Sequence, residues 1–280
     1  MSRASAQPES ERQMKRVAAL FPAILVCVLG LWGRPAYAYR PFNSTDAAVA
    51  TRGDIEIECG PFGYIVDADG RFLVIPTAIV NIGIADGWEI VIEGRNFLRV
   101  ASINPDRADT IRETALSVKH VLREGSLQER SGPSIAFESG LLLPGIGTDP
   151  GVGASLAGIV SQRWSAVTVH VNGELMLTRE HAWGGFAGAI VEGPSKWLVR
   201  PVAEVTVEQD AGLTTSGLVG AIWQVHEHLS LDAGWRVVRS QGSNVREFRA
   251  GFTWAFPIGA GSDTRRTAPQ PAVSRSRLGA

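Results

Sequence analysis

Cysteine is scarce in this chain of 280 residues, which contains only two. Cys27 lies in an N-terminal stretch that we expect to be removed, so Cys59 would be the single thiol of the mature chain and no intramolecular disulfide could form. A charge imbalance is also lacking, because 27 Lys and Arg face 28 Asp and Glu, which gives no reason to expect a nucleic-acid partner. Glycine and tryptophan are well represented, with 31 and 8 residues, and favour a glycine-jointed β protein without a disulfide framework.

The N-terminus has the pattern of a secretory signal. The basic sequence Met14-Lys15-Arg16 precedes an apolar stretch over residues 17–32, and Ala36-Tyr37-Ala38 supplies a cleavage site of the small-x-small type. We therefore predict a signal peptide over residues 1–38, with Met14 as an alternative start. The competing interpretation is a membrane anchor helix, and the proline and glycines within this stretch and the cleavage site argue against it.

The most informative pattern lies near the C-terminus. Apolar and polar residues alternate over residues 229–238 and again over 247–256, with a turn-like sequence at 240–244 between the two runs. Alternation with a period of two places one set of side chains on each face of a sheet. Strands of soluble proteins have about five or six residues, whereas an amphipathic strand of about ten suits a tilted bilayer crossing. The final sequence, residues 251–256, is similar to the aromatic terminal strand that outer-membrane assembly machinery recognises.

Comparable alternation recurs upstream from Asp54, separated by turn sequences such as those at 67–70 and 85–87. We predict an all-β fold, a closed antiparallel up-and-down transmembrane β-barrel over residues 54–256. It should have about twelve strands, with ten to fourteen as the range, because such barrels have even strand numbers. Residues 39–53 form a lead-in, and residues 257–280, rich in Ser, Arg, Pro and Gly, form a disordered tail. Pro201 conflicts mildly with the strand assigned around it, since proline removes a ladder donor.

The alternation also assigns side chains to the two faces of the barrel. The polar face should line the lumen with Glu56, Glu58, Glu89, Glu93, Lys119, His170, Asn172, Glu174, Arg200, Glu204, Asp232, Arg236, Glu247 and Arg249. The apolar face should present to lipid the aromatic residues Trp88, Trp197, Trp223, Trp235, Phe248, Phe252, Trp254 and Phe256. Charges in a narrow interior need partners, so we expect Arg236 beside Glu247 or Arg249, and Arg200 and Glu204 each paired with a neighbouring strand.

A family resemblance rests on short motifs at both ends of the barrel. These are Arg40-Pro41-Phe42, Thr45-Asp46-Ala47 and residues 53–58 at the start, and residues 218–223 and 229–234 near the end. The chain resembles outer-membrane barrel proteins labelled after the meta-pathway of phenol degradation or simply "transporter". The resemblance spans nearly all of the mature chain and implies an outer-membrane channel for small molecules, with aromatic compounds among the candidates. Unlike the usual pattern, about two dozen residues follow the terminal aromatic Phe256.

Sequence motifs for chemistry are weak. His226-Glu227-His228 places two imidazoles on one face of a strand, which suits a metal pair, but a turn next to Trp223 is the preferred interpretation. His170 with Glu174 nearby could belong to a lipase-like site, yet no serine has the sequence context of a nucleophile. Glycine-rich stretches match no phosphate-binding loop. The sequence therefore predicts no enzyme, and no catalytic, cofactor or metal site.

The leading hypothesis is an outer-membrane channel or transporter that gives passive passage to a small solute, aromatic or hydrophobic molecules included. One alternative is a structural or surface barrel whose lumen is filled by side chains and residues 39–53. A second is a secreted soluble barrel with its apolar faces turned inward around a ligand. The expected partners are outer-membrane lipid, the assembly machinery and a small solute. Turns at 67–70, 102–109 and 241–244 should face outside, and the turn at Pro194 should face the periplasm.

Overall fold

The computed structural model describes residues 41–67, 70–102, 110–146, 150–210, 212–240 and 243–258. Within these residues the strands are β1 (Asp54–Val66), β2 (Gly70–Ala85), β3 (Trp88–Ser102), β4 (Thr110–Arg123), β5 (Ser134–Leu142), β6 (Gly153–Arg163), β7 (Thr168–Leu177), β8 (Trp183–Glu192), β9 (Val199–Gln209), β10 (Leu213–His226), β11 (Leu229–Ser240) and β12 (Ser243–Pro257). A 3-10 turn, η1 (Ser126–Gln128), lies between β4 and β5. The predicted signal peptide and nearly all of the predicted tail lie outside the described residues.

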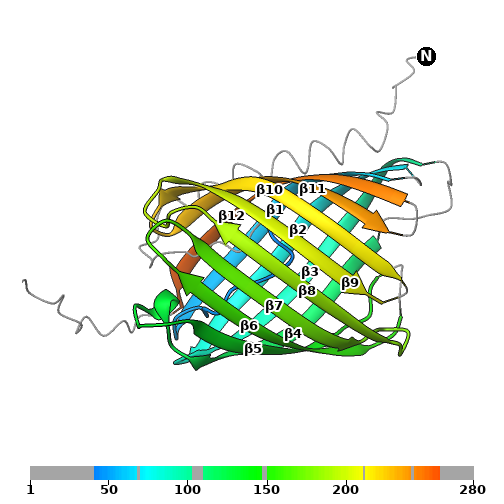
Figure 1. Cartoon of the computed structure of the whole chain (residues 1–280). Helices are drawn as coiled ribbons and strands as arrows, with labels where there is room; N and C mark the ends of the chain where they lie inside the picture. Colours follow the sequence, from blue (N-terminus) through cyan, green and yellow to red (C-terminus); the bar gives the residue numbers. More distant parts are fainter. Residues whose placement is uncertain are drawn as a thin grey trace, which may run out of the picture.

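The strands form one closed antiparallel barrel in which each strand pairs with its neighbours in sequence (Figure 1). β1 and β12 close the barrel, with Asp54 opposite Pro257 and Val66 opposite Arg246. This confirms the predicted fold and the prediction of about twelve strands. Closure gives backbone groups on every strand a partner on each side, which a lipid environment requires because it offers no hydrogen bonds of its own.

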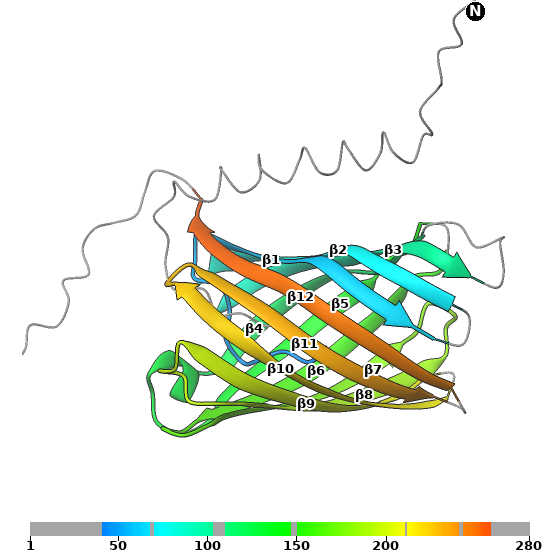
Figure 2. The same cartoon turned by 90° about the horizontal axis from the view of Figure 1, so that it is seen from above.

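The connections between strands separate into two ends of the barrel (Figures 1 and 2). One end, here called the terminal end, holds the start of β1, the end of β12, η1 and the turn at Pro194. The other end, the loop end, holds the last residues of β1, β3, β5, β7, β9 and β11 and the first residues of the strands that follow them. The strand ends that flank the three turns predicted to face outside therefore lie at one end of the barrel, opposite the turn predicted to face the periplasm. No helix within the described ranges has the length and apolar character needed to cross a membrane.

Prolines coincide with irregularities in the ladder. The β1–β12 register shifts between Cys59 and Phe62, on either side of Pro61, and the β2–β3 register shifts between Val74 and Thr77, around Pro76. Pro201 nevertheless lies inside β9 opposite Ala221, and its carbonyl accepts a hydrogen bond from Gly193. The conflict seen in the sequence is thus accommodated near the start of that strand.

The two faces of the barrel differ in chemistry as the alternation indicates. Outward-facing side chains are exposed and apolar, including Leu116, Val118, Leu175, Val205 and Val219. Five tryptophans, Trp88, Trp164, Trp197, Trp223 and Trp254, lie near strand ends on the side of the terminal end. Aromatic residues at this position are typical of the girdle that marks a membrane interface.

Candidate functional site: the lumen and its plug

Residues 41–53 are here called the plug: residues 41–50 lie inside the barrel, and the exposed residues 51–53 lead from it into β1 (Figure 2). They form no helix or strand, and they enter the lumen from the terminal end. Phe42, Ser44, Asp46 and Ala47 are buried, with Ala47 fully inaccessible. The lead-in predicted from the sequence is therefore an internal element, as in the alternative hypothesis of a filled barrel.

Side chains from the barrel wall hold the plug through its backbone N–H groups. The Glu204 carboxylate accepts hydrogen bonds from the N–H groups of Asn43 at 3.0 Å and Ser44 at 2.7 Å. The Glu89 carboxylate accepts one from Ala50 at 2.6 Å. A chain segment without a paired strand must satisfy its polar groups in some other way when it is buried, and charged acceptors make the stronger hydrogen bonds.

Neutral side chains and one arginine bind further backbone groups of the plug. Asn172 accepts a hydrogen bond from the N–H of Thr45 and donates one to its carbonyl, at 3.0 and 2.7 Å. Arg249 donates to the carbonyl of Pro41 at 2.8 Å, and its other nitrogen lies 2.8 Å from Glu247. Because these groups come from β7 and β12, the plug contacts opposite parts of the barrel wall.

Lys119 is the buried charge at the centre of the plug contacts. Its ammonium lies 3.5 Å from the Glu89 carboxylate and 3.9 Å from that of Asp46, and it donates a hydrogen bond to Thr45 at 3.1 Å. Burial raises the pKa of Asp46, while the nearby Lys119 charge acts in the opposite direction. Two carboxylates around one ammonium compensate much of the cost of taking the three charges out of water.

His170 belongs to a second polar network beneath the plug. Its Nδ1 lies 2.8 Å from the Ser161 hydroxyl, and its Nε2 lies 3.6 Å from Glu192. The serine that sequence context did not reveal is thus supplied by β6, and the carboxylate partner is Glu192 instead of Glu174. The Ser161 oxygen also accepts the N–H of Ala47 at 2.9 Å and is fully buried. The arrangement therefore holds the plug and leaves no approach for a substrate.

Apolar contacts and a glycine in the barrel wall also position the plug. Phe42 packs in a cluster with four inward-facing residues, Ile190, Val202, Leu218 and Ile222. A Cβ atom built on Gly188 would collide with the Ser44 hydroxyl and crowd the Phe186 ring, so a larger residue here would force the Ser44 side chain to move. The wall is thus shaped for the plug as well as charged for it.

Beyond the plug, towards the loop end, the lumen opens into a chamber of about 440 Å³. Phe42, Asn43, Ser44 and Thr45 form its floor. Its wall carries charged side chains, namely Glu58, Glu89, Glu93, Arg95, Glu113, Lys119, Glu138, Glu174, Arg179, Glu208 and Arg236. Seven of these side chains are acidic and four are basic, so the lining is net negative.

The basic groups of the chamber have close partners, whereas four of its glutamates form no ion pair with a described residue. Arg95 pairs with Glu113 at 3.0 Å, Arg236 with Glu247 at 3.6 Å, and Arg179 donates to backbone carbonyls. Glu93, Glu138, Glu174 and Glu208 form no ion pair with any residue of the described ranges. Glu138 repels both Glu93 and Glu174, and Glu208 repels Glu174, while the more distant Arg95 and Arg236 act favourably on Glu93 and Glu208. These carboxylates are supplied by alternate strands, β3, β5, β7 and β9.

All fourteen side chains that the sequence assigned to the lumen lie on the inner face. Eleven are buried or lie in the plug contacts, namely Glu56, Glu58, Glu89, Lys119, His170, Asn172, Arg200, Glu204, Asp232, Glu247 and Arg249. The other three, Glu93, Glu174 and Arg236, line the chamber, which Glu58, Glu89, Lys119 and Asn172 of the first group also border. Most of the aromatic residues assigned to lipid lie on the outer face of the barrel. Trp235 on β11 and Phe248, Phe252, Trp254 and Phe256 on β12 alternate with the buried lumen residues, and Trp88 and Trp223 are exposed on β3 and β10. Trp197 is exposed in the loop between β8 and β9, not in a strand.

Several lumen groups were not identified from the sequence. Glu138 shares the inner face of β5 with the buried Ser134, so strict alternation could have assigned it. Asp46 and Ser161 could not be assigned that way, because their roles depend on the plug. The expected pairings hold for Arg236 with Glu247 and for Arg200, which lies 3.7 Å from Glu192 on the neighbouring strand. Glu204 instead binds the plug.

Among the solved structures that resemble this chain are channels and porins. An outer membrane channel from Pseudomonas putida F1 gives a TM-score of 0.53 at 10% sequence identity, covering 77% of this chain and 99% of that chain. A KdgM porin in complex with disordered oligogalacturonate gives 0.49 at 9%, covering 72% and 99%, and the CymD monoaromatic hydrocarbon channel gives 0.44 at 8%, covering 75% and 90%. No protein-family model and no curated protein sequence matches the chain. At this identity the likeness to the Pseudomonas putida channel shows the fold alone, a closed antiparallel β-barrel.

Proposed function

We propose that the protein is an outer-membrane channel that admits a small polar solute, with the plug restricting passage. The observation that carries this proposal is the charged, hollow chamber of about 440 Å³ between the plug and the loop end. A barrel that served only as a scaffold would gain stability from a filled interior, since unpaired charges facing a cavity contribute nothing favourable to folding. The terminal end would face the periplasm and the loop end the outside.

The outward face supports a membrane location. Large apolar side chains are exposed around the barrel, and values such as 67% for Leu175 and 62% for Val219 would be unfavourable over so wide an area in water. A soluble ligand-binding barrel requires the reverse arrangement, with apolar side chains inward. The polar interior and apolar exterior therefore favour outer-membrane lipid as the surrounding medium.

The charge of the chamber favours cationic or neutral polar solutes over anions. Four glutamates without a described cationic partner face the same space, whereas the arginines are held by carboxylates or carbonyls. Rings of acidic side chains select cations in other channels. An aromatic or hydrophobic solute, as the family resemblance implies, would have to displace water from these carboxylates, so it stays an untested prediction.

The structural barrel remains the second candidate because the plug fills the lumen at the terminal end. The two functions differ in what removal of the plug does. A channel should conduct more when residues 41–53 are deleted, whereas a structural barrel should lose stability and still not conduct.

Planar-bilayer recordings of the purified full chain and of a variant lacking residues 41–53 test this proposal. We expect small or infrequent conductance steps for the full chain, several-fold larger steps for the deletion, and a reversal potential in a KCl gradient that indicates cation preference. Migration of unheated and heated samples on a gel confirms that both proteins are folded barrels. Absence of conductance from both folded proteins would establish the structural barrel instead.

A further inference from the structure

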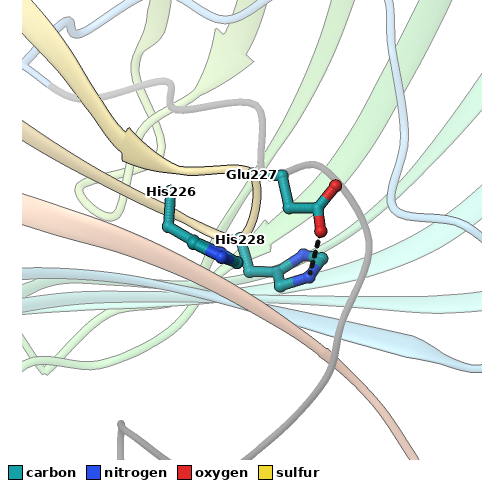
Figure 3. Close-up of side chains that lie close together, drawn as sticks. All are labelled: His226, Glu227 and His228. Carbon is teal, nitrogen blue, oxygen red and sulfur yellow. Dashed lines mark ion pairs between the residues drawn. The ribbon is translucent and has the colours of Figure 1, made fainter.

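The turn between β10 and β11 gathers three metal-binding side chains outside the lumen contacts described above (Figure 3). His226 ends β10, and Glu227 and His228 connect it to Leu229, the first residue of β11. The imidazole rings of His226 and His228 lie 5.2 Å apart between centroids. One ligand atom from each of the three residues lies within 4.8 Å of the others. The geometry points to a transition-metal site at this turn, on the terminal end of the barrel.

The distances are close to those that a metal would impose. The Glu227 carboxylate lies 3.4 Å from Nε2 of His228. In a tetrahedral zinc site with bonds of about 2.0–2.2 Å, neighbouring ligand atoms are about 3.3–3.5 Å apart. An ion seated between this carboxylate and this imidazole would therefore need little adjustment of either. The His226 ring has to close by at most about 1.4 Å on the same scale, and its exposed side chain can rotate about its χ angles.

The backbone of the turn is held while the ligands remain adjustable. The carbonyl of His226 accepts a hydrogen bond from the Gln224 side chain at 2.7 Å, and that of His228 accepts one from the Ala255 N–H of β12 at 3.1 Å. The His228 side chain is 8% exposed, whereas that of Glu227 is 64% exposed. One ligand is thus fixed in the wall, and the other two can close over an ion arriving from solvent.

The donor set defines the class of ion. Two imidazole nitrogens and one carboxylate oxygen suit Zn²⁺, Ni²⁺ or Cu²⁺, whereas Ca²⁺ and Mg²⁺ require mostly oxygen ligands. Three protein ligands leave a fourth position for water or for a group on a bound molecule, as in zinc sites that are not purely structural. The site does not depend on whether the barrel conducts, so its failure and that of the proposed channel are separate results.

Titration calorimetry of the full chain in detergent, purified without a polyhistidine tag and stripped with EDTA, tests the site with Zn²⁺ and Ni²⁺. We expect one equivalent of Zn²⁺ to bind saturably, and His226→Gln and His228→Gln to weaken binding more than about tenfold. His181→Asn is the matched control. It removes an exposed histidine at the loop end whose φ of 63° asparagine tolerates, and it should leave binding unchanged.

Co²⁺ supplies a second measurement, because its visible absorption bands report imidazole and carboxylate coordination directly. The bands should appear with the wild-type chain and the His181→Asn variant and disappear with His226→Gln. Glu227→Gln should weaken Zn²⁺ binding in a barrel that still shows the mobility change on heating. Equal affinity in the wild type and the folded His226→Gln variant, or the lack of saturable binding by the wild type, would overturn the assignment.

Discussion

The two halves of the lumen carry similar residues in opposite situations. Glu89, Glu204 and Lys119 are buried and bound to the plug, although Glu89 and Lys119 also border the chamber. Glu93, Glu138 and Glu208 face the chamber and form no ion pair with a described residue. Glu204 and Glu208 show the contrast most directly, because they lie four residues apart on the same face of β9. One binds two backbone N–H groups, and the other faces a cavity. The role of a charged side chain in the lumen therefore depends on its position along the barrel axis relative to the plug.

This difference also separates stability from permeation. Charges in the plug half are partly desolvated, so removing one partner leaves another unsatisfied in a buried site. Charges in the chamber half keep contact with water, so neutralising them should cost little stability and should change the potential that a passing ion meets. Each substitution below is chosen to enlarge or to remove this contrast.

Replacing Lys119 with Met should have the largest effect. The change leaves the Asp46 and Glu89 carboxylates close together without their cation, and breaking such a buried pair costs about 3–5 kcal/mol. We expect a lower temperature for the heat-induced mobility shift and a displaced plug, measured as increased conductance. Lys196→Met, at an exposed position in the loop between β8 and β9, is the control. Equal stability of the two variants would mean that the Lys119 contacts do not hold the plug.

Glu204→Gln should release the first residues of the plug. The amide keeps the shape of the side chain but loses the charge that strengthens two N–H contacts, a loss of about 1.5–3 kcal/mol. Channel openings should become more frequent in bilayer recordings. The paired variant is Glu208→Gln, on the same face of β9, which should alter ion preference without changing how often the channel opens. The contrast between the two halves would be lost if both variants opened alike.

Gly188→Ala should displace the plug by steric conflict with Ser44. Overfilling a packed site costs about 1–3 kcal/mol, and the Ser44→Gly substitution should recover that cost because it removes the colliding hydroxyl. Accessibility to a thiol reagent of a cysteine introduced at Ala47, which is fully inaccessible in the seated plug, reports the displacement when it is measured in a Cys59→Ser background. Gly173→Ala serves as control, since nothing lies within 4 Å of its Cβ position. Failure of the double variant to restore protection would assign the effect to the strand instead of the plug.

Neutralising Glu138 and Glu174 together should have the smallest effect on stability and a clear effect on permeation. Both carboxylates face the chamber and form no ion pair with a described residue. Neutralising them therefore relieves the repulsion between them and breaks no ion pair. We expect an unchanged mobility-shift temperature and a reversal potential in a KCl gradient closer to zero. An unaltered reversal potential in a plug-deleted background would show that the chamber does not set ion preference.

Much of the barrel could be predicted from the sequence because its pattern is local. Strand faces follow from alternation within a few residues, so Leu231 and Asp232 are assigned to opposite sides without knowledge of any neighbour. Register was predictable where a short turn joins two strands, as for Arg236 and Glu247. Glu204 shows the limit, because its face was predictable and its partner was not.

The sequence by itself determined a closed amphipathic barrel, the identity of its two faces and the mixed charge of its interior. Only the tertiary structure decided which charged side chains bind the plug and which face the chamber. The contact between Ser44 and Glu204 joins residues 160 positions apart, and it exists because closure of β1 against β12 returns the start of the chain to the lumen. The alternation of apolar and polar residues along a strand cannot predict such a contact. Whether a glutamate holds the plug or faces the chamber depends on where thirteen unpatterned residues, 41–53, come to rest inside the wall.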